Sequence, residues 1–490
     1  MFTTVLVANR GEIACRIIRT LRRLGIRSVA VYHHEDRATP HVGMAERAIE
    51  LHGAVPAAAY LDQGQILDAC RVCEVEAVHP GYGFLSENAA FAGAIEAAGI
   101  AFIGPDANVM HLMGDKIRAR EFARTNGVPI SPSVDLMAAS SDLEASVASL
   151  GYPLLIKASA GGGGKGMKVV RNAAELAPQV TLAMGEARRY FGDDRVYAER
   201  LLERPRHIEV QVLGDGEGNV LHFGERECSL QRRYQKIVEE APAPSLPVDL
   251  RQEICGAATR LAGAAKYRNA GTVEFILGND GSFYFLEMNT RLQVEHPVTE
   301  MVYGVDLVEL QLRVAAGEGL LHRQVDIQPR GHAIECRICA EEPDRDFRPA
   351  TGRIGLLREP VGEGIRIDGG IREGHLVTPA FDSMLAKVIA FGGDRKQAAT
   401  RLEAALRGMV MLGVASNIDY LTRILAHPEF LAGRLHTGML GELASDLSRP
   451  AAETTLSDAA VVAAALGLRE IRHCLFDVPE PHASIGFWRN

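Results

Sequence analysis

The 490-residue sequence has little of what marks a membrane, secreted or nucleic-acid-binding protein. Its longest nearly apolar run, residues 459–468, is about half as long as the roughly 20 residues of a membrane-spanning helix. The first residues lack the basic stretch that opens a secretion signal, and 62 Asp and Glu outnumber 53 Lys and Arg. We therefore expect a cytoplasmic protein that binds neither a membrane nor a nucleic acid.

Cysteine is also scarce, with eight residues in the whole chain, yet two CxxC pairs raise the question of a metal site. Cys70 and Cys73 continue the apolar spacing of a predicted helix. Cys336 and Cys339 lie on a predicted strand, where positions three apart face opposite sides and cannot converge on one zinc ion. We expect these residues to be packing cysteines.

The length and the order of the first elements predict a multidomain α/β protein. A single core stops growing at about 250 to 300 residues, and residues 5–32 and 65–98 each show alternating strand and helix patterns typical of a parallel sheet. The first turn carries only Gly11, which argues against a dinucleotide cofactor. The outer face of the first helix is predicted to be either solvated or a partner surface; it carries Arg16, Arg19, Arg22 and Arg23.

Four consecutive glycines, Gly161–Gly164, lie between predicted strands at residues 153–157 and 167–170. A P-loop would open a helix and end in Gly-Lys-Ser or Gly-Lys-Thr, so the pattern instead predicts a mobile hairpin flap. Backbone without Cβ atoms can approach phosphate oxygens closely, and Lys157 and Lys165 add positive charge. We interpret the loop as a phosphate-binding flap, with a flexible connector as the alternative.

Residues 272–289 predict a hairpin with a four-residue turn. In that register Glu274 opposes Phe285, and Glu287 is a diagonal neighbour of Glu274 on the same face, about 7 to 8 Å away. Two carboxylates and Asn289 on one face of an apolar hairpin suit magnesium. Two exposed acids on an edge hairpin are the alternative.

Continued alternation past this strand would place Arg291, Gln293 and Glu295 on the same face. Arginine can grip a small planar oxyanion with two hydrogen bonds, glutamine can orient it, and glutamate can accept its proton. Spacing alone leaves a surface salt-bridge cluster open as the alternative.

Five ordered motifs closely resemble those of the biotin carboxylases, ATP-grasp enzymes that occur as free subunits or as the first part of acyl-CoA and pyruvate carboxylases. The motifs are residues 8–14, 79–88, the four-glycine loop, 287–297 and 381–384. The resemblance covers roughly residues 1–446 and is far more specific than a single glycine loop.

The resemblance implies an α/β and α+β multidomain fold. Its parts would be an N-terminal parallel α/β (pre-ATP-grasp) domain at 1–113, an ATP-grasp domain at 120–316 with a mobile glycine-rich lid at about 131–204, and a C-terminal biotin carboxylase domain at 331–446. Residues 447–490, with the only tryptophan, Trp488, would start a following linker, dock on a partner, or end at a cut within a longer chain.

The resemblance also implies a role for each site residue. ATP would be bound by Lys116, Lys157, Gly162, Gly163, Gly164, Glu199, Leu202, His207 and Gln231. Magnesium or manganese would be bound by Glu274, Glu287 and Asn289, and bicarbonate by Lys236, Arg291, Gln293 and Val294. Glu295 would be the general base and Arg337 would stabilise the biotin enolate, so the catalytic set would be Glu295, Arg291, Arg337 and Lys236.

The implied activity is ATP-dependent carboxylation of biotin by bicarbonate through carboxyphosphate, the first half-reaction of a biotin-dependent acyl-CoA carboxylase. The chain lacks an Ala-Met-Lys-Met or Glu-Met-Lys-Met biotinylation site, so biotin would arrive on a carrier domain or protein and pass to a carboxyltransferase subunit. A homodimer is also expected, through the N-terminal helix bearing Arg16 and Arg19.

Two alternatives differ from this assignment. Another ATP-grasp ligase would share the flap and the magnesium hairpin. A nucleotide-binding scaffold without turnover is motivated by Tyr234 and Ala160, which stand where the family usually has His and Gly. Phe381 also replaces a usual Tyr. No departure removes a group with a proposed chemical role.

Overall fold

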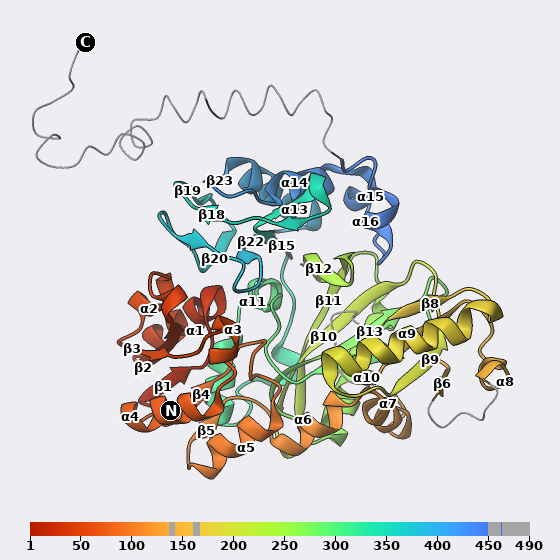
Figure 1. Cartoon of the computed structure of the whole chain (residues 1–490), viewed down its shortest axis with the longest axis horizontal. Helices are drawn as coiled ribbons and strands as arrows, with labels where there is room; N and C mark the ends of the chain where they lie inside the picture. Colours follow the sequence, from red (N-terminus) through yellow and green to blue (C-terminus); the bar gives the residue numbers. More distant parts are fainter. Residues whose placement is uncertain (137–142, 160–166, 449–461, 463–490) are drawn as a thin grey trace, which may run out of the picture.

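The structure is a computed structural model that describes residues 1–136, 143–159, 167–448 and 462. Figure 1 shows three regions: an N-terminal α/β region, a central region that includes a small outlying sheet, and a C-terminal region. The predicted tail at 447–490, with Trp488, lies almost wholly outside the described residues. Among the residues described, no helix has both the length and the apolar character that a bilayer crossing requires.

The N-terminal region is a parallel sheet in the order β3-β2-β1-β4-β5, which confirms the α/β prediction. Its strands are β1 (Thr4–Val7), β2 (Arg27–His33), β3 (Arg47–Leu51), β4 (Ala77–His79) and β5 (Ala101–Phe102). Its helices are α1 (Gly11–Arg23), α2 (Pro40–Met44), α3 (Pro56–Ala59), α4 (Gln63–Cys73), α5 (Ala89–Ala97) and α6 (Ala107–Gly114). The turns after β1 and β4 meet at the carboxyl edge of the sheet, where Asn9 Nδ2 donates to the carbonyls of Pro80 at 2.7 Å and Tyr82 at 2.8 Å. Ligands of such sheets bind at this edge.

The prediction for the arginine face of α1 was wrong for Arg16. Its side chain is buried and contacts Glu300 at 2.7 Å and Asp306 at 2.8 Å, because later parts of the chain pack against this helix. Arg19 remains 45% exposed beside Asp368, and Arg22 and Arg23 are also exposed.

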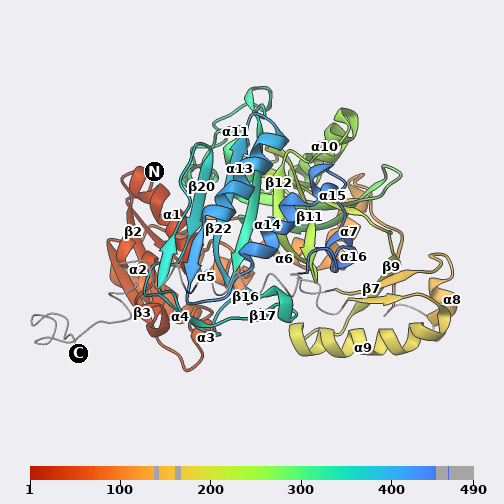
Figure 2. The same cartoon turned by 90° about the horizontal axis from the view of Figure 1, so that it is seen from above.

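A small antiparallel sheet forms its own unit after α7 (Lys116–Thr125). Its strand order is β6-β9-β7-β8, with β6 (Ser133–Asp135), β7 (Leu154–Ala158), β8 (Lys168–Val170) and β9 (Val196–Arg200). Helix α9 (Ala173–Phe191) runs along this sheet, and α8 (Leu143–Val147) lies at its end (Figures 1 and 2). Pairing of β7 with β8 confirms that the glycines join two strands. The flap residues Gly162, Gly163, Gly164 and Lys165 lie outside the described residues, as does Ala160.

The central and C-terminal regions share one eight-stranded sheet, in the order β14-β13-β10-β11-β12-β15-β22-β20. The strands are β10 (Arg206–Asp215), β11 (Val220–Arg232), β12 (Gln235–Ala241), β13 (Arg268–Leu277), β14 (Phe283–Asn289), β15 (His332–Cys339), β20 (Ile365–Gly369) and β22 (Met384–Gly392). All neighbours pair antiparallel, and β12 joins β15 in the middle. Figure 2 shows α13 and α14 over one side of the C-terminal strands.

The remaining elements surround this sheet. The helices are α10 (Val248–Ala264), α11 (His296–Tyr303), α12 (Leu307–Ala315), α13 (Arg395–Gly408), α14 (Ile418–Ala426), α15 (Pro428–Leu431) and α16 (Met439–Glu442). The short strands are β16 (Glu341–Glu342), β17 (Arg348–Pro349), β18 (Gly352–Arg353), β19 (Leu356–Arg358), β21 (Leu376–Val377) and β23 (Val410–Leu412). The 3-10 helices are η1 (His34–Asp36), η2 (Gln324–Asp326) and η3 (Pro343–Arg345). Cys70, Cys73, Cys336 and Cys339 are all free thiols.

The register of the β13–β14 hairpin differs from the prediction. Ser282 stays in the turn because its N–H and hydroxyl both bond Asp280, so Leu277 pairs with the next residue. A bulge after Glu274 then shifts the strands again, and Glu274 lies directly opposite Glu287 rather than diagonal to it. The two residues are therefore closer neighbours along the hairpin than predicted.

Candidate active site

A cavity of about 640 Å³ opens between the N-terminal turns, the small sheet and the shared sheet. Its lining brings together most of the site residues predicted from the sequence. They are Lys116, Lys157, His207, Gln231, Lys236, Glu274, Glu287, Asn289, Arg291, Gln293, Val294, Glu295 and Arg337. Tyr82 and Gly83, from the turn after β4, close one side.

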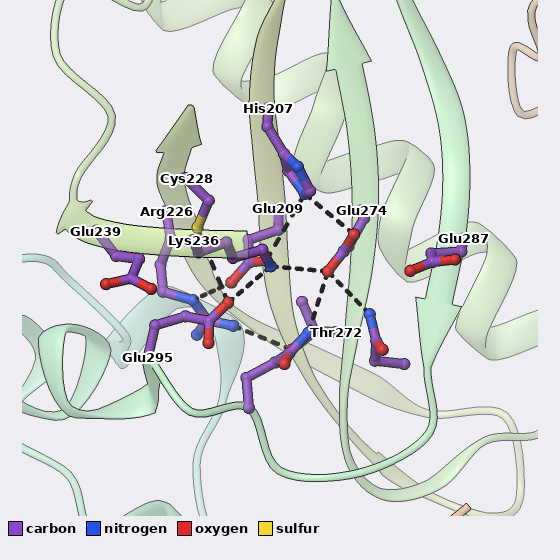
Figure 3. Close-up of polar contacts among 12 residues, drawn as sticks. His207, Glu209, Arg226, Cys228, Lys236, Glu239, Thr272, Glu274, Glu287 and Glu295 are labelled. Atoms are coloured by element: carbon purple, nitrogen blue, oxygen red, sulfur yellow. Dashed lines mark hydrogen bonds and ion pairs between the residues drawn. The ribbon is translucent and has the colours of Figure 1, made fainter. Parts of the chain in front are cut away.

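Lys236 on β12 is the centre of the polar network (Figure 3). Its Nζ lies 2.5 Å from Glu209, 2.8 Å from Glu274 and 2.7 Å from Glu295, and its side chain is 12% exposed. Burial alone would lower the pKa of Lys236, but the three carboxylates raise it well above its ordinary value. Lys236 therefore carries a permanent positive charge.

Glu274 accepts hydrogen bonds from several elements at once. The amides of Asn289 and Gln293 donate to its Oε1 at 2.9 and 3.1 Å, and His207 Nε2 lies 3.0 Å from its Oε2. Burial would raise the pKa of Glu274, but Lys236 and His207 hold it well below its ordinary value. The carboxylate is therefore ionised across the working range of pH.

Two of the predicted metal ligands, Glu274 on β13 and Glu287 on β14, pair directly, and the third, Asn289, lies two residues further along β14. Lys116 Nζ, at the start of α7, contacts the Glu287 carboxylate. Two carboxylates and an amide carbonyl are hard oxygen donors of the kind that magnesium prefers, so the donor set fits this ion.

The residues after β14 form a loop, so the predicted continued strand was wrong: β14 ends at Asn289 and α11 begins at His296. The loop still turns the predicted side chains into the cavity. Arg291 donates to Gln293 Oε1 at 2.7 Å, to Asn289 Oδ1 at 3.0 Å and to Glu87 Oε2 at 2.9 Å. Buried Lys387 stabilises this loop, because its Nζ donates a hydrogen bond to the carbonyl of Val294 at 2.7 Å.

Glu295 occupies the position just before α11, where it is completely buried. Its Oε1 lies 2.7 Å from Lys236 Nζ, and its Oε2 accepts a hydrogen bond from Arg337 Nη2 at 3.0 Å. Burial would raise the pKa of Glu295, but Lys236, Arg337 and Arg226 hold it well below its ordinary value. The side chain is therefore an ionised carboxylate between two cations.

The predicted nucleotide-binding residues separate into a group that lines the cavity and a group that does not. Lys116, Lys157, His207 and Gln231 line it, whereas Glu199 and Leu202 do not. Lys157 on β7 forms an ion pair with Glu199 on β9, and Gln231 Nε2 lies 2.8 Å from His207 Nδ1. Glu199 is buried behind Lys157, where Arg120 also reaches it at 3.3 Å, and Leu202 lies just past the end of β9. Neither Glu199 nor Leu202 belongs to the described lining of the cavity.

Several residues of the site were missed in the sequence. They are Glu209, which contacts Lys236; Arg226, which bonds Glu209 at 2.5 Å; Glu239, which holds Arg337; Glu87, which holds Arg291; and Lys387. One signal was available for Glu209, because polar residues alternate with Ile208, Val210 and Val212 along β10 and thus mark a polar face. The others depend on pairings between distant segments.

Two of the residues that depart from the family pattern, Tyr234 and Phe381, line the cavity, whereas Ala160 lies outside the described residues. Tyr234 lies in the tight turn between β11 and β12 with φ 66°, is half exposed and lines the cavity. The ring of Phe381 covers the Arg10 guanidinium at 3.8 Å. Neither residue belongs to the network around Lys236.

Comparisons with known proteins agree on one family. Family models described as "Biotin carboxylase, N-terminal domain", "Carbamoyl-phosphate synthase L chain, ATP binding domain" and "Biotin carboxylase C-terminal domain" match residues 1–110, 115–323 and 335–442. A biotin carboxylase of Allochromatium vinosum is 49% identical over 439 residues, which are 88% of this chain and 96% of the relative. The mitochondrial methylcrotonoyl-CoA carboxylase subunit alpha of Mus musculus is 45% identical over 468 residues, 95% of this chain but 65% of that subunit.

A solved structure is similar over nearly the same length. The biotin carboxylase domain dimer of Hydrogenobacter thermophilus 2-oxoglutarate carboxylase, in complex with MgADP, ADP and bicarbonate, is 44% identical. It matches with a TM-score of 0.89 over 92% of this chain and 99% of that one. The likeness thus extends through the regions that form the cavity.

Proposed function

The chain belongs to the biotin carboxylase family, and from that premise we propose how its own residues carry out the reaction. The enzyme is an ATP-dependent ligase that carboxylates biotin with bicarbonate. Its substrates are ATP, used with magnesium, bicarbonate, and biotin presented on a carrier. The observation that carries the residue roles is the permanently charged Lys236 beside the ionised Glu295 in one cavity.

Lys116, Lys157 and His207 bind the phosphates of ATP in this proposal, together with Gln231 and the flap glycines Gly162, Gly163 and Gly164. Glu199 and the backbone near Leu202 hold the adenine. Lys116 contacts Glu287, Lys157 contacts Glu199, and both lysines line the cavity. Each lysine can exchange a carboxylate for a phosphate oxygen when the nucleotide binds.

Glu274, Glu287 and Asn289 hold magnesium in this proposal, and manganese can replace it. When bound, the ion supplies positive charge that neutralises the phosphate oxygens. The direct pairing of Glu274 with Glu287, the position of Asn289 two residues further along β14, and the hard oxygen atoms of all three support them as ligands.

Lys236, Arg291, Gln293 and the backbone of Val294 bind bicarbonate, and Glu295 accepts its proton. The freed oxygen attacks the γ-phosphorus of ATP, the bond to the β-phosphate oxygen breaks, and carboxyphosphate and ADP form. Carboxyphosphate then breaks into carbon dioxide and phosphate. Two cations beside Glu295 keep it ionised before the step and favour the incoming anion.

Arg337 stabilises the enolate that biotin forms when phosphate removes the proton of its ureido nitrogen. That nitrogen then bonds to the carbon of carbon dioxide, which gives carboxybiotin. The position of Arg337 supports this role, because its Nη2 reaches into the cavity to Glu295, while Glu239 contacts Nε at 2.6 Å and the same Nη2 at 2.5 Å.

The proposal keeps the predicted domain division: 1–113, 120–316 with a lid at about 131–204, 331–446, and the tail at 447–490. It also places the enzyme in the cytoplasm as a homodimer that works with a biotin carboxyl carrier and a carboxyltransferase subunit. Because Arg16 is buried within the protein, Arg19 is the arginine of α1 that we assign to the dimer surface.

The test is the dependence of ATP cleavage on bicarbonate and biotin. We expect phosphate release to require bicarbonate and to rise with free biotin, and Lys236→Met to remove both effects. Arg395→Met is the matched control. In the wild type Arg395 forms an ion pair with buried Glu240 at 2.6 Å, and neither residue lines the cavity, so the variant loses a comparable ion pair away from the site. Cleavage indifferent to bicarbonate would favour another ATP-grasp ligase, and nucleotide binding without cleavage would favour a scaffold.

A further inference from the structure

Two buried glutamates lie side by side next to Arg337. Glu239 on β12 pairs directly with Glu335 on β15, and both side chains are 0% exposed. Arg337 is two residues from Glu335 on the same strand and therefore shares its face. Its guanidinium donates to Glu239 at 2.6 Å through Nε and to Glu295 at 3.0 Å through Nη2.

Glu335 differs from Glu239 in that its carboxyl group receives no hydrogen bond from any described residue. Among the residues that the structure describes, neither of its carboxyl oxygens has a hydrogen-bond partner. An ionised carboxylate that is buried without a donor pays the full cost of leaving water, and a directly opposite second carboxylate adds repulsion. The geometry therefore favours one proton on this pair, and it favours Glu335 as its holder because Glu239 already receives the Arg337 hydrogen bonds.

Charged and titratable groups reach this region from every element packed around Glu335. They are Lys236 and Glu239 on β12, Arg337 on β15, Lys387 on β22, Arg366 and Asp368 on β20, Glu295 before α11, His296 and Glu300 on α11, and Glu12 on α1.

The nearby cations already have other partners. Lys387 Nζ donates to the carbonyl of Val294 at 2.7 Å and lies 3.4 Å from Glu12. Arg366 contacts Glu300 and Asp368 at 2.8 and 2.7 Å. Burial, reinforced by the neighbouring carboxylates, raises the pKa of Glu335 well above its ordinary value despite these cations.

We propose that Glu335 is a positioning residue that stays protonated in the working enzyme and thereby leaves the Arg337 guanidinium available to the substrate. An ionised Glu335 would lie on the same face of the strand and would compete with the developing biotin oxyanion for the N–H groups of Arg337. Glu239, by contrast, must be ionised to orient that guanidinium; burial, opposed by Arg337, raises the pKa of Glu239 to about 7, so its carboxylate forms as the pH rises through neutrality. The inference rests on the role of Arg337 given above.

The first experiment compares pH profiles of kcat/KM for biotin in the wild type, Glu335→Gln and Glu239→Gln. Glutamine has the shape of a protonated glutamate and cannot ionise, so Glu335→Gln should keep the wild-type rate at neutral pH. It should also shift the alkaline decline of kcat/KM upward by about one pH unit or more. Glu239→Gln should instead raise KM for biotin at every pH, because Arg337 loses its acceptor.

The second experiment reads the proton directly. At about pH 8, where ordinary carboxyl groups are ionised, infrared spectra of the wild type should show a carboxylic-acid C=O band that is missing in Glu335→Gln. Glu335→Met is a second neutral variant that should also lack the band. If the wild-type spectrum lacks this carboxylic-acid band, Glu335 is ionised and the proposal is overturned, whatever the variants show.

The outcomes separate this inference from the proposed function. A Glu335→Gln enzyme with the wild-type alkaline decline, or with a KM defect like that of Glu239→Gln, would overturn the inference. Arg337→Gln serves as the reference: if it carboxylates biotin normally, the proposed role of Arg337 fails. If Arg337→Gln is inactive while the Glu335→Gln profile is unchanged, only the inference about Glu335 fails.

Discussion

Replacement of Glu295 by Gln removes the proposed general base and changes little else in the cavity. The carboxylate accepts hydrogen bonds from Lys236 at 2.7 Å and Arg337 at 3.0 Å. A glutamine can accept from one of them with its carbonyl, but its NH2 group cannot accept from the other. Lys236 keeps Glu209 and Glu274, and Arg337 keeps Glu239, so no cation is left without a partner.

These contacts set the expected magnitudes. One lost hydrogen bond between charged groups corresponds to about 1.5 to 3 kcal/mol of stability, which a folded protein of this size can tolerate. Loss of a general base costs about 10² to 10⁴ in rate, equivalent to about 3 to 5 kcal/mol in activation free energy. We therefore expect Glu295→Gln to bind MgATP normally and to lose bicarbonate-dependent ATP cleavage.

The assay measures phosphate release with and without bicarbonate, nucleotide affinity by titration, and thermal unfolding. Glu300→Gln is the matched control, because Glu300 is also buried, lies on α11, and contacts two arginines, Arg16 at 2.7 Å and Arg366 at 2.8 Å, outside the cavity. It should lose similar stability and keep its activity. Turnover of Glu295→Gln near that of the wild type would refute the base assignment, and loss of nucleotide binding in parallel would mean that the network had collapsed.

Three further predictions concern metal use, assembly and pH. Glu287→Gln should raise the magnesium concentration needed for half-maximal rate, with partial recovery in excess magnesium; a rate indifferent to magnesium would place Glu287 outside the metal site. Arg19→Glu should weaken the dimer in sedimentation by reversing the charge beside Asp368, and an unchanged dimer would place the interface elsewhere. Burial lowers the pKa of His41 from 6.5 to about 4, so the unfolded state binds the extra proton, and His41 alone should lower stability by at most about 1.4 kcal/mol per pH unit as the pH drops from about 6.5 to about 4. His41→Gln should reduce this slope in acid unfolding, whereas an unaltered slope would contradict the assignment.

Local pattern was sufficient for much of the fold. The strand and helix alternation near the N-terminus predicted the parallel sheet, and the pairing of β7 with β8 around the glycines followed from two apolar runs. Such features depend on periodicities of two and 3.6 residues, which the chain carries within a few turns or strands. The order of motifs likewise predicted the family, and most of the site residues that it implied line the cavity.

The tertiary structure decided which of these residues meet. Arg16 and Arg19 look alike on the first helix, yet only Arg16 is buried, because Glu300 and Asp306 arrive from a distant segment. Ser282 bonds Asp280 and stays in the turn, which shifts the hairpin register, and a separate bulge after Glu274 brings that residue opposite Glu287.

The charge network depends on pairings that no local pattern contains. Glu239 meets Glu335 because β12 joins β15 in the shared sheet, and Lys236 meets Glu295 because the loop after β14 turns into the cavity. The sequence by itself determined which faces are polar and which chemistry they carry. Only the tertiary structure determined how many carboxylates each buried cation must balance, because burial and electrostatic energy depend on distances between segments far apart in the chain.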